Sequence, residues 1–178
     1  MNKILLHSCC APCSAAVLEW LLNNNFVPTL FYYNPNIFPK EEYEKRKNEL
    51  TRHALRLDVE VIDGDYNHEE WLSTVKGLEH LPERSIRCEK CFEIRLNKTA
   101  EKTAQLHISQ FATTLSSSRW KDLAQISDAG NKAAVKYDNV SFFDRNWRKD
   151  GLQQRRNELM KENNFYNQIY CGCEFSVR

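Results

Sequence analysis

The seven cysteines of this 178-residue chain fall into three groups, and none of them stands alone. In chain order the groups are Cys9, Cys10 and Cys13; Cys88 and Cys91; and Cys171 and Cys173. Cysteine thiolates bind soft metals and iron–sulfur clusters, and they also exchange with disulfides. Grouping of this kind predicts metal or redox chemistry. It argues against seven buried thiols that act only as small apolar side chains.

The first group lies where a strand passes into a helix. Residues 4–6 form an apolar run typical of a buried strand, residues 15–22 have the composition of a helix, and Pro12 suits a first helical position. A helix N-terminus carries partial positive charge and unpaired N–H groups, and both favour thiolate over thiol. We therefore expect this turn to hold reactive sulfur.

Two C-x-x-C pairs, Cys10 with Cys13 and Cys88 with Cys91, are the usual ingredients of a four-thiolate zinc or iron–sulfur site. A structural zinc is the weaker alternative, because such ions usually stabilise small domains that lack a core. The spacing favours these four thiols as ligands of a cluster or a catalytic metal. It does not exclude Cys9.

The last pair, Cys171 and Cys173, flanks a single glycine. A disulfide ring with one intervening residue is strained, and strain makes a disulfide labile, which suits electron transfer. Gly172 removes the side-chain clash that such a ring would suffer. We expect a mobile tail that carries this redox pair into the site. The alternative is a tail whose cysteines are incidental.

The net charge of +1 gives the chain no general attraction for nucleic acids, so any basic surface must be local. Residues 145–161 are a candidate, with six Lys or Arg against two Asp or Glu and with Trp147 placed for stacking. No apolar run approaches the ~20 residues of a membrane span, and no signal peptide is visible. We expect a cytoplasmic protein with no membrane partner and no structural disulfide framework.

Strand and helix patterns alternate along the chain. The predicted strands are residues 4–6, 26–33, 59–62, 108–113 and 140–143, and the predicted helices are 15–22, 40–57, 69–75, 88–104, 121–134 and 152–162. Gly130 is a candidate break in the fifth helix. This alternation predicts a single Rossmann-like α/β domain over residues 1–178, with a parallel sheet of about five strands and helices on both faces. A C-terminal helical segment and the redox tail complete it.

Polar residues follow each predicted strand, and they are the first cysteines, Asn34 and Asn36, Asp63 and Asp65, residues 113–118, and Asp144. Any one of these residues is an ordinary turn former. Ligand sites of open parallel sheets lie outside the carboxyl ends of the strands, so agreement across five strand ends predicts one cleft. Within it, Asp65, Asp144 and His7 are candidate proton donors.

Five motifs together resemble the epoxyqueuosine reductases of the QueH family. They are HSCCAPC at 7–13, YNPNI at 33–37, RCEKC at 87–91, FATTLSSS at 111–118 and YCGC at 170–173. The motifs occur in order and span nearly the whole chain.

The resemblance implies the last step of queuosine biosynthesis, in which the epoxide of epoxyqueuosine at the wobble position of tRNA is reduced to an alkene. It implies a [4Fe-4S] cluster on four ligands, which are Cys9, Cys10, Cys88 and Cys91. It also implies a redox-active disulfide between Cys171 and Cys173. The partners would be tRNA carrying epoxyqueuosine and an electron donor that the resemblance does not identify. This ligand set contains Cys9 in place of Cys13, which the C-x-x-C spacing favours.

Three other functions stay open from the residues alone. A thioredoxin-like thiol–disulfide oxidoreductase would explain Cys10 and Cys13 but leaves Cys88 and Cys91 without a role. An ATP-dependent tRNA-thiolating enzyme would need a Ser/Gly-rich phosphate loop where the first cysteines stand. A non-enzymatic RNA-binding module fits poorly with the near-neutral net charge.

Overall fold

The computed structural model describes residues 2–176, and its centre is one sheet of five parallel strands. The strands are β1 (Asn2–His7), β2 (Phe26–Tyr32), β3 (Val61–Asp63), β4 (Gln110–Thr113) and β5 (Ser141–Phe142). Their order across the sheet is β3-β2-β1-β4-β5, with every neighbouring pair parallel. The predicted α/β fold is therefore confirmed, because helix after each of the first four strands returns the chain to the start of the next parallel strand.

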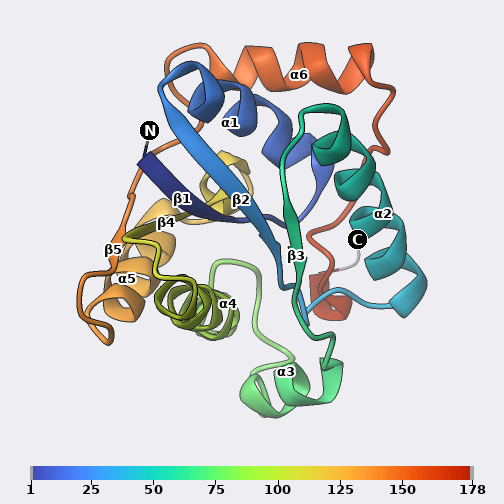
Figure 1. The fold of residues 1–178 in the computed structure, drawn as a ribbon. Helices are drawn as coiled ribbons and strands as arrows, with labels where there is room; N and C mark the ends of the chain where they lie inside the picture. Colours follow the sequence, from blue (N-terminus) through green and yellow to red (C-terminus); the bar gives the residue numbers. More distant parts are fainter. Residues whose placement is uncertain (1, 177–178) are drawn as a thin grey trace.

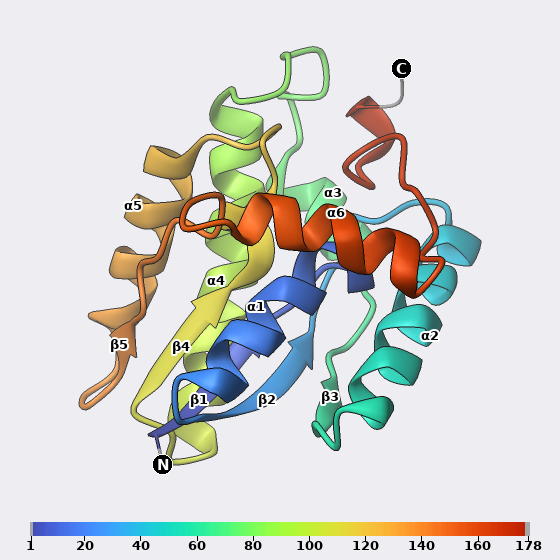
Figure 2. The same ribbon diagram turned by 90° about the horizontal axis from the view of Figure 1, so that it is seen from above.

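Helices cover both faces of the sheet (Figures 1 and 2). They are α1 (Ala11–Asn23), α2 (Lys40–Arg56), α3 (His68–Thr74), α4 (Ile86–Gln105), α5 (Leu123–Ala134) and α6 (Leu152–Glu162). One hydrophobic core joins the sheet to α1 and α2, and a second joins it to α4 and α5. Helix α6 lies over α1 as an outer layer (Figure 2).

Strand β1 shows why the sheet needs cover on both sides. Ile4 and Leu6 point into the core shared with α1, whereas Leu5 points into the core shared with α4. All three are fully buried, as the continuous apolar run of a central parallel strand predicts.

The predicted break at Gly130 is wrong, because α5 continues through it to Ala134. A side chain at Gly130 would place its Cβ only 2.3 Å from a ring carbon of Phe142 on β5. The glycine therefore serves close packing of helix on strand, and the helix tolerates its weak propensity.

Among residues 2–176, no helix is both long enough and apolar enough to cross a membrane. The chain after α6 runs back past α2 to a short 3-10 turn, Glu174–Ser176 (Figure 2). This return brings the last cysteines toward the carboxyl ends of the strands, where the candidate site lies.

Candidate functional site

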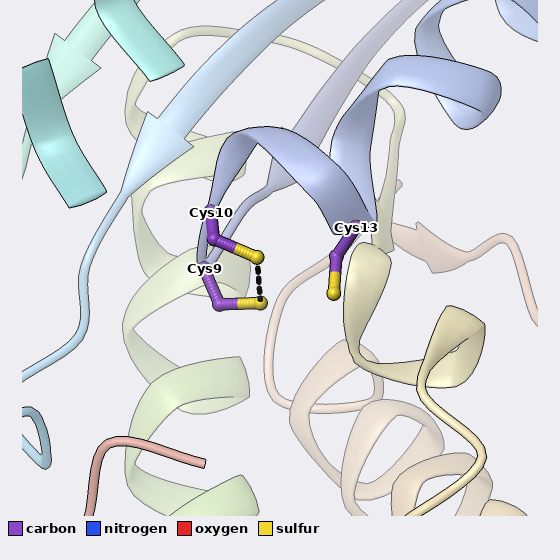
Figure 3. A group of neighbouring side chains, drawn as sticks. All are labelled: Cys9, Cys10 and Cys13. Carbon is purple, nitrogen blue, oxygen red and sulfur yellow. Dashed lines mark hydrogen bonds between the residues drawn. The ribbon is translucent and has the colours of Figure 1, made fainter. Parts of the chain in front are cut away.

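The first cysteine group occupies the turn between β1 and α1 (Figure 3). The sulfur atoms of Cys9, Cys10 and Cys13 all lie within 4.8 Å of one another, and the three side chains are buried. Helix α1 begins directly after Cys10, with Pro12 in its first turn, so the predicted strand-to-helix turn is confirmed. Three sulfur atoms held this close can bind one metal ion or one edge of a cluster.

Charge in this turn is concentrated on Cys9. Hydrogen bonding between Cys9 and the thiols of Cys10 and Cys13 lowers the pKa of Cys9 well below its ordinary value, and the cations Lys121 and Arg95 lower it further. Hydrogen bonds with Cys13 and Cys9 raise the pKa of Cys10, and the pKa of Cys13 is raised as well, so Cys9 is the most acidic of the three thiols. Deprotonated sulfur is the form that binds metal.

The second group lies at the start of α4, on the opposite face of the sheet. The backbone N–H of Arg84 donates to the sulfur of Cys88 at 3.3 Å, and Arg95 donates to the sulfur of Cys91 at 3.9 Å. Arg95 also donates to Asn34 Oδ1 at 2.6 Å, and the predicted cleft residue Asn34 donates to the carbonyl of Ser8, beside Cys9, at 2.9 Å. This chain of contacts links the two cysteine groups.

Two cavities gather all three cysteine groups at the carboxyl edge of the sheet. The inner cavity is lined by Cys88, Cys91, Cys171 and Cys173. The outer cavity, of about 670 Å³, is lined by Cys9, Cys13 and Cys171. Cys171 lines both, and so do Glu83, Trp120 and Lys121. Where the strand ends predicted one cleft, the structure has two cavities with shared lining residues, and within residues 2–176 only the first group forms a tight sulfur cluster.

The tail that carries Cys171 is held in place, so the expectation of a mobile tail is wrong. The buried guanidinium of Arg46 donates to the carbonyls of Tyr170 and Cys171, each at 3.2 Å. The backbone N–H of Phe38 donates to the carbonyl of Gly172 at 2.9 Å. Gly172 has a φ of +111°, which only glycine adopts readily, and a Cβ there would lie 2.8 Å from the side chain of Ile37.

Cys171 and Cys173 are free thiols in this structure, as are the other five cysteines. A hydrogen bond from Cys173 lowers the pKa of Cys171 well below its ordinary value, and the nearby Lys121 adds to this effect. The Cys171 sulfur also lies 3.1 Å from the hydroxyl of Ser176. Cys171 is thus the more acidic thiol of the pair.

The three predicted proton donors do not line either cavity. His7 is fully buried, with Nε2 donating to the carbonyl of Tyr33 at 3.0 Å and Nδ1 accepting from the hydroxyl of Thr113 at 2.9 Å. Burial lowers the pKa of His7 to about 3, so the imidazole is neutral and ties the ends of three strands together. Asp65 and Asp144 are exposed, and Asp144 accepts a hydrogen bond from Ser127.

The side chains of the basic segment 145–161 have different surroundings, and only some of them face the outer cavity. Trp147 is only 2% exposed and donates its indole N–H to the carbonyl of Thr113, so its predicted role in stacking is wrong. Arg155 is paired with three carboxylates, those of Glu19, Glu158 and Glu162. Arg148 and Arg156 do line the outer cavity.

The sequence analysis singled out residues 113–118 but not the next three residues of the loop, 119–121. Lys121 and Trp120 line both cavities, and Trp120 is 52% exposed. The one available signal was an aromatic residue beside a lysine in a polar loop that follows the Ser-rich strand end. Such a pattern is weak on its own, because loops position their side chains through distant contacts.

A parallel α/β sheet with a thiol-lined cleft at its carboxyl edge defines a Rossmann-like redox or metal enzyme. Comparison with known proteins gives the particular family. The profile of the family described as "Epoxyqueuosine reductase QueH" matches residues 4–178. This chain belongs to the QueH family of epoxyqueuosine reductases and is an oxidoreductase.

Curated relatives support the assignment over nearly the full chain. A protein named epoxyqueuosine reductase QueH from Haemophilus influenzae is 48% identical over 177 residues, covering 99% of this chain and 72% of the relative. Its namesake from Acinetobacter baylyi is 44% identical over 177 residues, covering 99% and 81%. The one from Thermotoga maritima is 38% identical over 180 residues, covering 99% and 91%. The thioredoxin-like, tRNA-thiolating and RNA-binding alternatives are thereby set aside.

Proposed function

We propose that this chain reduces epoxyqueuosine to queuosine at the wobble position of tRNA. The reaction consumes two electrons and two protons, breaks both C–O bonds of the epoxide, and releases water as an alkene forms. The observation that carries the proposal is that thiols of all three cysteine groups line two cavities that share Cys171, in a chain of this family. A tRNA substrate also supports the expectation of a cytoplasmic location.

The donor set fits an iron–sulfur cluster. Thiols from two separate turns line the two neighbouring cavities, and Cys9 is already biased toward thiolate. Four thiolates bring more negative charge than a [4Fe-4S] core offsets, so such a site needs cations nearby. Arg95 and Lys121 supply them.

We assign the cluster to Cys9, Cys10, Cys88 and Cys91, as the resemblance to the family implies. Bound there, it would supply single electrons at low potential. The tight grouping of Cys9, Cys10 and Cys13 leaves the spacing-based set, with Cys13 in place of Cys9, as the competing assignment.

We assign proton delivery to Lys121, whose position at both cavities suits the role better than those of His7, Asp65 and Asp144. Burial alone would lower the pKa of Lys121, but the thiols around it, chiefly Cys171 and then Cys9, outweigh burial and raise the pKa. The ammonium therefore holds its proton at Nζ until the epoxide oxygen develops negative charge.

The Cys171–Cys173 pair can supply as many electrons and protons as reduction of the epoxide consumes. Oxidation of Cys171 and Cys173 from dithiol to disulfide releases two electrons and two protons, which is what the epoxide consumes. The more acidic Cys171 lies at both cavities, so it is placed to begin this oxidation. An external donor must then restore the dithiol.

The experiment is a single incubation of anaerobically purified protein with tRNA carrying epoxyqueuosine and a low-potential reductant, without ATP. Nucleoside analysis should show queuosine in place of epoxyqueuosine. Unchanged epoxyqueuosine with protein that carries iron and sulfide would overturn the assignment.

A further inference from the structure

The loop at residues 118–121 is fixed by two arginines from distant parts of the chain. Arg84 donates to the carbonyl of Arg119 at 2.8 Å and to that of Trp120 at 3.0 Å. Arg148 donates to the carbonyl of Lys121 at 2.6 Å and also to that of Ser118. Guanidinium groups thus bind four successive carbonyls, and these hydrogen bonds fix the backbone conformation of the loop.

On this fixed loop, Trp120 exposes 52% of its surface. Trp71 and Trp147 are buried, and Trp20 packs within an aromatic cluster, so Trp120 stands apart from the other tryptophans of the chain. The guanidinium carbon of Arg119 lies 4.8 Å from the Trp120 ring. A large aromatic side chain that a rigid loop leaves half exposed to solvent is typical of a binding surface.

Cations surround the outer cavity that Trp120 lines. Its basic side chains are Arg46, Arg119, Lys121, Arg148 and Arg156, against one acidic side chain, Glu83. On a chain whose net charge is +1, this is a strong local excess. A cavity of about 670 Å³ is also large enough to admit a nucleoside. An exposed aromatic ring beside basic side chains is how proteins bind unpaired nucleotides.

We propose that Trp120 is the stacking platform for one nucleobase of the anticodon loop, with Arg119 and Arg156 bound to flanking phosphates. The inference rests on the proposed function and adds the residue that holds the RNA. A base stacked on Trp120 would keep the neighbouring modified base inside the outer cavity, beside Cys171. The fixed loop means that little ordering is required when RNA binds.

Binding of an unmodified anticodon-arm RNA hairpin tests the platform directly. Trp120→Leu should weaken binding about tenfold or more, whereas Trp120→Phe, which keeps an aromatic face, should lose less than about threefold. Val135→Ala is the control, because Val135 is 84% exposed on another part of the surface. Tryptophan fluorescence of the wild type should fall when the hairpin binds, and this change should vanish in Trp120→Phe. Thermal unfolding of each variant checks that the fold is kept.

Turnover on tRNA carrying epoxyqueuosine separates this inference from the proposed function. With Trp120→Leu, KM should rise by more than kcat falls. If the wild type reduces the epoxide but Trp120→Leu keeps both hairpin affinity and KM, the platform is wrong and the function stands. If hairpin affinity depends on Trp120 but no epoxide is reduced by cluster-loaded wild type, the function is wrong and the platform stands.

Discussion

The guanidinium of Arg46 and the carbonyl of Cys171 meet at 3.2 Å although 125 positions separate them in the chain. Arg46 is 1% exposed, and its remaining hydrogen bonds go to Tyr170 and Glu42. One side chain on α2 therefore helps to fix the C-terminal tail that carries Cys171. Loss of the Arg46 guanidinium should therefore disturb the tail more than it disturbs the hydrophobic core.

Arg46→Lys keeps the positive charge but cannot bond both carbonyls at once. We expect alkylation of Cys171 to become roughly tenfold faster, and the free energy of unfolding to fall by about 2 kcal/mol, because two charged hydrogen bonds are disturbed. Mass spectrometry of timed alkylation measures the first and denaturant unfolding the second. Asn48→Ala, at an exposed position of the same helix, is the control. Equal alkylation rates in wild type and variant would show that Arg46 does not hold the tail.

Cysteine variants distinguish the two ligand sets. Cys88→Ala should abolish cluster assembly under both assignments, because each contains Cys88. Cys13→Ala should keep about four iron and four sulfide per chain under the family-based set, whereas Cys9→Ala should lose them. Anaerobic iron and sulfide analysis gives the answer. The reverse pattern would favour the spacing-based set, and stoichiometric zinc without sulfide in the wild type would contradict both.

Cys173→Ser should leave folding and cluster content nearly unchanged while turnover falls at least ~10-fold, about 1.4 kcal/mol in the barrier. The loss follows because a serine cannot complete the dithiol. An artificial reductant can bypass the pair, so turnover is measured with a dithiol donor as well. Full activity of Cys171→Ser and Cys173→Ser with both donors would make the tail pair incidental. Loss of the cluster in either variant would make the tail a metal ligand.

Arg155 and Arg156 are adjacent in sequence but face different surroundings. Arg156 lines the outer cavity, whereas Arg155 is engaged with Glu19, Glu158 and Glu162. Arg156→Gln should weaken tRNA binding and lower the slope of its salt dependence by about one, and Arg155→Gln should leave that slope unchanged. Filter binding across a salt series measures both. Identical slopes for the two variants would place the phosphate contact elsewhere.

His53 gives the fold a pH dependence far from the thiols. Burial, with help from the Arg56 charge, lowers the pKa of His53, whose ring packs edge-on against Phe165. The unfolded chain then binds more protons, so stability is present above about pH 6.5 and is lost as pH falls toward the folded-state pKa. His53→Leu should flatten the decline in the free energy of unfolding between about pH 7 and 5. His80→Leu, at an exposed position, should not.

The elements of the fold were predictable because buried parallel strands are nearly all apolar and amphipathic helices repeat their pattern. The position of the first cysteine group was predictable because it directly follows a strand, and strand ends meet at one edge of the sheet. The prediction for Trp147 was wrong because an aromatic residue between arginines gives the same sequence pattern whether its side chain is buried or exposed. Lys121 and Trp120 were missed because Arg84 and Arg148, about 30 positions away, fix their loop. No local pattern carries that information.

The placement of Cys171 has a consequence for the order of events. Among the described cysteines, it alone borders both the inner and the outer cavity. A nucleoside in the outer cavity would therefore lie beside the same sulfur that an external donor must reduce. The tRNA and the donor would then reach Cys171 by turns, the tRNA while the pair is a dithiol and the donor while it is a disulfide. The kinetics would follow a ping-pong scheme, in contrast to a ternary complex in which both partners are bound at once.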